Sequence, residues 1–240
     1  MSIELLSNLF LLLAGLMAIV VIGIFFRYLE GRVRTTSIAI FVAWLLYAGT
    51  FGYKGIIASR VPPGPALLLI PVVLFMAIFL VRHPSVREFA SKIPAGVLIG
   101  LQSFRVFVEI ALHELYQNRM VPRMLTFEGA NFDIFVGLSA PLVAWLYTSR
   151  RINDSVVRLW SIAGIALLAN VIIRSLLTFA GILKTETANV GIGIFPFTSL
   201  PGFLAPSRCT FTSCSCAPYL GSPVMLKKSV QSWQVFSLKS

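Results

Sequence analysis

The sequence is short of charged residues, and acidic residues are the scarcest among them. Charged side chains make up 12% of the 240 residues and hydrophobic ones 57%, whereas soluble domains carry about 25% charged residues. This chain therefore has too few polar side chains to cover a soluble domain of useful size. The composition predicts an all-α membrane domain whose main partner is the lipid bilayer.

Basic residues outnumber acidic ones by 20 to 9, which gives a net charge of +11. Nucleic-acid binding would need these cations to cluster on a soluble module, and the sequence contains no such module. The excess instead matches the positive-inside bias of bacterial membrane proteins. We therefore expect no nucleic-acid partner and a location in the bacterial inner membrane.

Motifs of the common catalytic and cofactor sites are also missing. The sequence has no G-x-S-x-G elbow, phosphate-binding loop, dinucleotide fingerprint or C-x-x-C pair. It has only two histidines, and His113-Glu114 lacks the second histidine of an H-E-x-x-H zinc site. The sequence thus predicts no cofactor and assigns neither a reaction nor a catalytic residue.

Long apolar runs predict a polytopic bundle of about seven transmembrane helices. The first run has no basic region before it and is too long for a signal peptide, so we expect a helix there. The last run is interrupted by Pro196, Pro201 and Pro206, and it is short for a membrane span. The predicted helices are 5–26, 37–57, 66–81, 94–117, 132–147, 159–183 and 190–206.

The connecting loops alternate in positive charge. The loops after the first, third and fifth predicted helices each carry three Lys or Arg residues, whereas the other loops carry two, two and one when Lys54, near the end of the second helix, is counted with the loop that follows it. Cytoplasmic loops are enriched in Lys and Arg. This pattern places the N-terminus outside.

Polar residues recur at helical spacing in the fourth apolar run. Spacings of 3, 4, 4 and 3 place them on one helix face, and we call them the polar stripe: Gln102, Arg105, Glu109, His113 and Tyr116. Ionisable groups at membrane depth cost about 2.5–3.5 kcal/mol each on insertion scales, so they rarely face lipid. We therefore expect the polar stripe to face the interior of the bundle.

More polar residues stand near the start of the next predicted helix, namely Glu128, Asn131 and Asp133. If the two helices pack together, these residues meet the polar stripe. They would then form a structural network, the path of a proton-coupled or small-solute transporter, or part of the metal site of a membrane-embedded enzyme. In the transporter, Glu109 and His113 would exchange protons and Arg105 would hold an anionic substrate group.

A weaker signal is Arg174, which shares a helix face with Asn170. A long side chain near the end of a membrane helix often extends to the lipid headgroups. We favour that interpretation over a binding site for Arg174.

The composition changes after residue 206. Residues 207–240 are rich in Ser, Thr, Pro and Lys and hold all three cysteines: Cys209, Cys214 and Cys216. In the neighbouring reading frame, codons 209–216 encode mostly apolar residues if the serines use TCN codons. We therefore expect a transmembrane domain over 1–206 and an atypical, disordered tail over 207–240 produced by a frameshift. The alternatives are lipidation, a metal site or a disulfide at the cysteines.

Two segments carry a resemblance to a known family. The run F-R-V-F-V-E-I-A-L-H at 104–113 and the run T-F-E-G-A-N-F-D at 126–133 resemble a family of uncharacterised bacterial integral membrane proteins, and the resemblance extends over 95–205. It implies a location and a fold class but no activity. The chain departs from the family at Asn118-Arg119, where a glycine-containing turn is expected, and after Pro206.

The frameshift is tested by the DNA sequence across codons 200–220, read from independent genomic DNA. We expect a single missing or extra base, beyond which the shifted frame continues an apolar helix. The same reading frame in closely related strains would contradict the frameshift and leave lipidation or thiol chemistry at the cysteines to be tested.

Overall fold

The computed structural model describes residues 2–58, 67, 71, 88–89 and 92–200. This part of the chain is built from helices joined by turns and loops, without a strand. The all-α prediction is therefore confirmed for the described residues. The predicted helix at 66–81 lies largely outside them, and the tail at 207–240 lies wholly outside.

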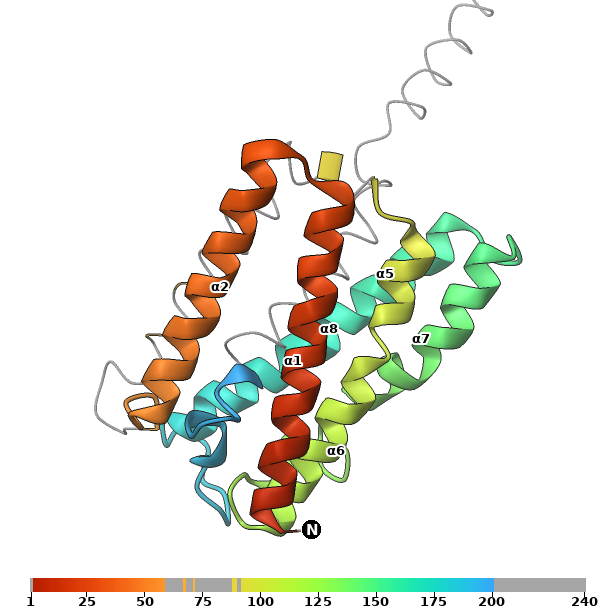
Figure 1. Cartoon of the computed structure of the whole chain (residues 1–240). Coiled ribbons are helices and arrows are strands. Elements are labelled where there is room, and N and C mark those ends of the chain that lie inside the picture. Colours follow the sequence, from red (N-terminus) through yellow and green to blue (C-terminus); the bar gives the residue numbers. More distant parts are fainter. Residues whose placement is uncertain (1, 59–66, 68–70, 72–87, 90–91, 201–240) are drawn as a thin grey trace, which may run out of the picture.

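The first two helices form an antiparallel hairpin, drawn in red and orange in Figure 1. Helix α1 spans Ile3–Tyr28 and begins at Ser2, whose hydroxyl accepts a hydrogen bond from the backbone N of Leu5 at 3.3 Å. Helix α2 spans Gly31–Tyr53 and so begins six residues before the predicted start at 37. The helix extends this far because no proline interrupts 31–37 and arginine favours helices.

The predicted helix 94–117 is divided in two where the polar stripe begins. Helix α5 spans Ala95–Leu101 and helix α6 spans Phe104–Gln117. At the junction, the backbone N of Gln102 bonds to the O of Ile99 at 3.0 Å and that of Ser103 to the O of Gly100 at 3.1 Å. These bonds span three residues instead of four, so the junction is a tightened turn. Together the two helices form a 23-residue column.

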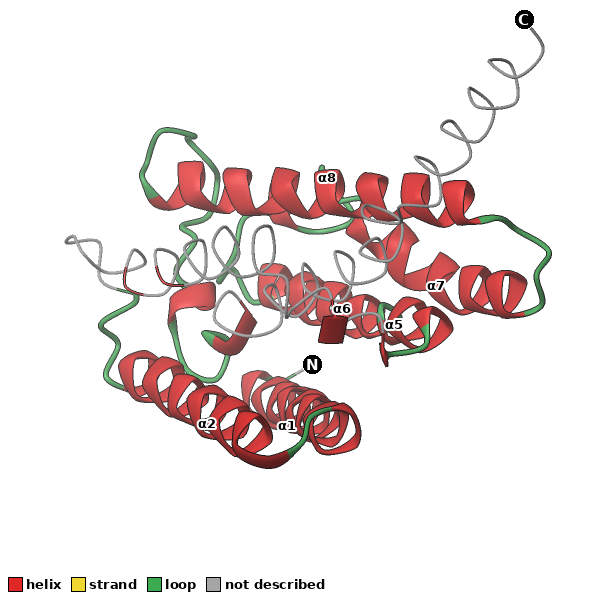
Figure 2. Cartoon of the chain, turned by 90° about the horizontal axis from the view of Figure 1, so that it is seen from above, coloured by secondary structure: helices red, strands yellow, loops and turns green. Residues whose placement is uncertain are grey.

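Helices α7 and α8 complete the described bundle. Helix α7 spans Asp133–Thr148, within one residue of its prediction, and packs along α5 and α6. Helix α8 spans Asp154–Phe179 and is capped by Asn153, whose side chain accepts from the N of Val156 at 3.1 Å. This cap explains why α8 starts before the predicted 159. Figure 2 shows α8 on one side of the α5–α7 layer and the α1–α2 hairpin on the other.

The prediction that a helix begins near residue 190 is wrong. Residues 191–193 form a short 3₁₀ turn, η3 (Gly191–Gly193), and further turns follow as far as Thr198. The chain is held here by contacts with distant segments: the N atoms of Val190 and Gly191 bond to the O of Met120 at 3.2 and 2.8 Å. A Cβ on Gly193 would lie 2.6 Å from the Cα of Ala58. These close contacts with other segments fix a backbone course that a helix could not follow.

Helix α1 is apolar on both its inner and its outer face. Leu6, Phe10 and Met17 are buried in a core shared with α5 and α6. On the opposite face, Leu12 and Ile19 remain 66% and 72% exposed. Such a helix suits lipid on its outer face. By length and composition, the stretches able to cross a membrane in the described residues are Ile3–Tyr28, Gly31–Tyr53, Ala95–Gln117 and Asp154–Thr178.

Candidate functional site

Beyond α6 the chain turns and runs back beside the helix that it has just left. The turn contains Arg119, whose φ of 56° lies in the left-handed region that glycine adopts most readily. This is the place where the family resemblance implied a glycine-containing turn. We call residues 120–132 the return segment. It includes the short 3₁₀ turn η2 (Arg123–Leu125) and is otherwise not helical.

The return segment and the first residue of α7 together place one polar partner beside each of three successive turns of α6. Four residues of helix rise about 6 Å, which two residues of extended chain also cover at about 3.3 Å each. Stripe residues four apart can therefore meet return-segment and α7 residues two or three apart. The pairs are His113 with Glu128, Glu109 with Asn131, and Arg105 with Asp133.

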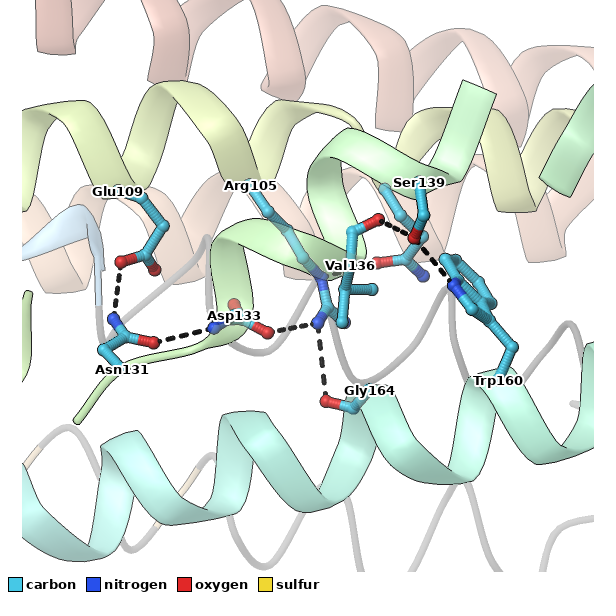
Figure 3. A network of polar contacts seen from close by, with 9 residues as sticks. Arg105, Glu109, Asn131, Asp133, Val136, Ser139, Trp160 and Gly164 are labelled. Atoms are coloured by element: carbon cyan, nitrogen blue, oxygen red, sulfur yellow. Dashed lines mark hydrogen bonds and ion pairs between the residues drawn. The ribbon is translucent and has the colours of Figure 1, made fainter. Parts of the chain in front are cut away.

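Arg105 is fully buried and connects three helices through one guanidinium group (Figure 3). Its Nη1 lies 2.5 Å from Oδ1 of Asp133 at the start of α7, and the same atom donates to the O of Gly164 on α8 at 3.4 Å. Its Nε donates to Oε1 of Gln102 in the α5–α6 junction at 2.9 Å. Asp133 and Gln102 are also fully buried. The charge of Arg105 is thus balanced by a carboxylate inside the protein.

Asn131 connects the Glu109 carboxylate to the first residue of α7. Its Nδ2 donates to Oε2 of Glu109 at 2.5 Å and to the O of Leu125 at 3.0 Å. Its Oδ1 accepts from the backbone N of Asp133, the first residue of α7, at 3.0 Å. One amide therefore fixes the end of the return segment, the start of α7 and the Glu109 side chain at once.

The outer end of the polar stripe is partly exposed. The side chains of His113 and Glu128 are 21% and 40% exposed, with Nδ1 and Oε1 3.7 Å apart. The imidazole ring stacks on Phe127 at 4.8 Å between centroids, and the ring of Tyr116 lies 6.3 Å from it. The stripe thus runs from a partly exposed imidazole into a fully buried ion pair.

The return segment is also held from its other side, by α8. Nδ2 of Asn170 donates to the O of Ala130 at 2.9 Å. Within the segment, the hydroxyl of Thr126 donates to the O of Arg123 at 2.9 Å. A Cβ on Gly129 would lie 2.4 Å from that same carbonyl oxygen, so no larger residue fits there without a shift of the backbone. The carbonyl groups of Arg123 and Ala130 in this non-helical stretch therefore have partners inside the protein.

Small residues that the sequence interpretation did not single out allow the close packing around Arg105. A Cβ on Gly137 of α7 would lie 2.9 Å from the backbone N of Val106, and one on Gly164 of α8 would lie 3.3 Å from Cγ1 of Val136. Trp160 on α8 also donates to the hydroxyl of Ser139 on α7 at 2.9 Å (Figure 3). The only sequence signal for this packing was the recurrence of small residues on apolar helices.

The residues proposed as metal ligands pair with other partners instead. Glu109 binds Asn131, and Asp133 binds Arg105. In the described part of the chain, no three His, Cys, Asp or Glu side chains come together as a ligand set.

Comparison of the sequence with family models, with curated proteins and with solved structures gives no match.

The central ion pair makes a stability prediction. Arg105→Met leaves Asp133 buried without its cation, so it should lower the free energy of unfolding by about 3–5 kcal/mol. The double variant Arg105→Met/Asp133→Leu removes both charges and should recover at least half of that loss, because an apolar pair of similar volume is often neutral. Both are measured by thermal unfolding in detergent. A double variant as unstable as Arg105→Met would contradict this account of the ion pair.

Proposed function

We propose that the chain is a multi-pass integral membrane protein of the bacterial inner membrane, with its N-terminus outside. Four described stretches are long and apolar enough to cross a bilayer. The α1–α2 and α7–α8 connections lie at the same end of the bundle in Figure 1, and each carries three arginines in or beside it: Arg27, Arg32 and Arg34, then Arg150, Arg151 and Arg158. This end is the one that we assign to the cytoplasm.

Aromatic side chains at this end support the same placement. The guanidinium of Arg151 lies 4.7 Å from the ring centroid of Trp145, and that of Arg34 lies 5.3 Å from that of Phe26. Both rings are more than half exposed. Aromatic rings and basic side chains together are typical of the level of the lipid headgroups.

The orientation predicts which side of the membrane a thiol reagent reaches. In a chain whose three cysteines are replaced by serine, Lys184→Cys should react with a membrane-impermeant maleimide in intact cells. Ser149→Cys, at the end of α7, should react only after the cells are permeabilised. Labelling of both in intact cells, or the reverse pattern, would contradict the orientation, and release of the protein by alkaline carbonate would contradict membrane insertion.

The polar stripe then serves as a packing network that holds the return segment inside the bundle. The observation that carries this proposal is Arg105, which is fully buried and bonded to α7, α8 and the α5–α6 junction. Non-helical backbone at membrane depth is tolerated where it is buried in protein. The network supplies that condition for residues 120–132 by fixing them against α6 and α8.

A second candidate function is proton-coupled or small-solute transport. The continuity of the polar stripe favours transport. The stripe runs from the partly exposed His113–Glu128 pair inward to Glu109 and Arg105. Rows of histidine and carboxylate side chains inside membrane proteins are the groups that proton relays use. The substrate would be a small molecule or an ion. Arg105 could hold this substrate only if its ion pair with Asp133 opened.

Glu109→Gln separates these two functions. As part of a packing network, Glu109 accepts a charge-assisted bond from Asn131, so the variant should lose about 1–3 kcal/mol of stability. In a transporter, the variant should stay folded and lose pH-driven proton uptake, which a pH-sensitive dye reports in proteoliposomes. The exposed Glu186→Gln is the control and should change neither property. If Glu109→Gln also changes neither, both proposed roles of the stripe are wrong.

A further inference from the structure

Arg174 lies on α8 five residues before the end of the helix, on the side that faces the return segment. Its Nε donates to Oδ1 of Asn170 at 2.8 Å, and Asn170 in turn donates to the O of Ala130. The arginine is half-buried. Its guanidinium is therefore held in one orientation by a neighbour that is itself bonded to the return segment.

No acidic side chain balances the charge of Arg174. The sequence has nine acidic residues, and all nine lie in the part of the chain that the structure describes: Glu4, Glu30, Glu88, Glu109, Glu114, Glu128, Asp133, Asp154 and Glu186. None of them forms an ion pair with Arg174, whereas Arg105 is paired with Asp133. A cation on a membrane helix is costly unless an anion or water accompanies it. For Arg174, an anion must come from outside the side chains of this chain.

The free side of the guanidinium suits one kind of anion. Among the described residues only Nε has a hydrogen-bond partner. The two terminal nitrogens carry four further N–H donors in one plane. This fork matches the two oxygens of a carboxylate or a phosphate, to which it can make parallel charge-assisted bonds.

We propose that Arg174, oriented by Asn170, binds an oxyanion group, either a phosphate or a carboxylate. The inference rests on the membrane placement proposed above, because the low polarity around α8 is what makes an uncompensated cation costly. Two sources can supply the group. Arg174 is near enough to the end of α8 for its long stem to reach a lipid headgroup, and a soluble anionic solute offers the same oxygens.

Binding at Arg174 would also bear on the polar stripe. Asn170 holds the carbonyl of Ala130, and the next residue, Asn131, holds Glu109. Arg174 and Asn170 are therefore linked to the Glu109 carboxylate through two neighbouring residues of the return segment, Ala130 and Asn131. In this proposal Arg174 is the residue that contacts the anion, and Asn170 is the residue that positions Arg174.

The test uses the purified full-length chain in dodecyl maltoside. It is titrated separately with inorganic phosphate, succinate and dihexanoyl phosphatidylglycerol, with dihexanoyl phosphatidylcholine as the uncharged reference, and binding is followed by calorimetry and by the shift in thermal midpoint. At least one anion should bind saturably. Arg174→Gln should weaken that binding about tenfold or more, and Arg174→Lys should weaken it less, because lysine keeps the charge but loses the fork.

The control is Arg123→Gln, which removes an exposed arginine of η2 and should leave the affinity unchanged. Binding of the phosphatidylglycerol alone identifies a lipid headgroup as the source, and binding of phosphate or succinate identifies a soluble anion. The proposal is overturned if no anion binds the folded wild-type protein, if Arg174→Gln binds normally, or if Arg123→Gln weakens binding equally. A wrong membrane placement would be seen separately, in the thiol-labelling experiment, which does not involve Arg174.

Discussion

The described bundle depends on the burial of one guanidinium group. Arg105 can lie at zero exposure only because Asp133, Gln102 and the carbonyl of Gly164 receive its N–H groups. Each of these partners belongs to a different element, so the need to satisfy one cation fixes α7, α8 and the α5–α6 junction relative to α6. Apolar helices in lipid gain little from the hydrophobic effect when they pack together, and a buried polar centre of this kind gives them a specific arrangement.

The return segment shows how the same centre governs a stretch of chain with no regular structure. Its residues are held by Glu109 and His113 from α6 and by Asn170 from α8. Its own turns supply further bonds, such as that of Thr126 to Arg123. The segment is therefore fixed by side chains on two helices that are far apart in sequence, and loss of either contact would free only one side of it.

Residue patterns predicted the helices better than the connections between them. Helices 5–26 and 132–147 follow from long apolar runs, and the structure has α1 and α7 close to those limits. The spacing of the polar stripe also placed Arg105 and Glu109 on one face, because helical periodicity is local. The short 3₁₀ turn at Gly191 was missed because it is held by contacts with Met120, which is distant in sequence. The break at Gln102 was missed because its short local bonds leave no mark on the apolar pattern.

The partners within the site were foreseen only in part. Asp133 and Asn131 were expected near the stripe, yet the sequence could not show that the chain reverses and rises beside α6. Gly137 and Gly164 were missed entirely, because a glycine in an apolar helix gives no hint of which neighbour approaches it. The role of each was visible only once Val106 and Val136 were located beside them.

The shortness of α7 has a consequence for the lipid around the protein. Its 16 residues span about 24 Å at 1.5 Å per residue, whereas the hydrocarbon layer of a typical bilayer is about 30 Å thick. Phe132 and Phe135 are half exposed or more. Phe132 lies directly before α7 and Phe135 within it, so they extend its apolar surface only slightly. In the proposed membrane setting, the return segment takes up the remaining depth before α7, where α6 and α8 hold it inside the bundle. The lipid beside α7 then meets a shorter helix than the lipid beside α1 or α8, which have 26 residues each, so any thinning of the bilayer is confined to that face.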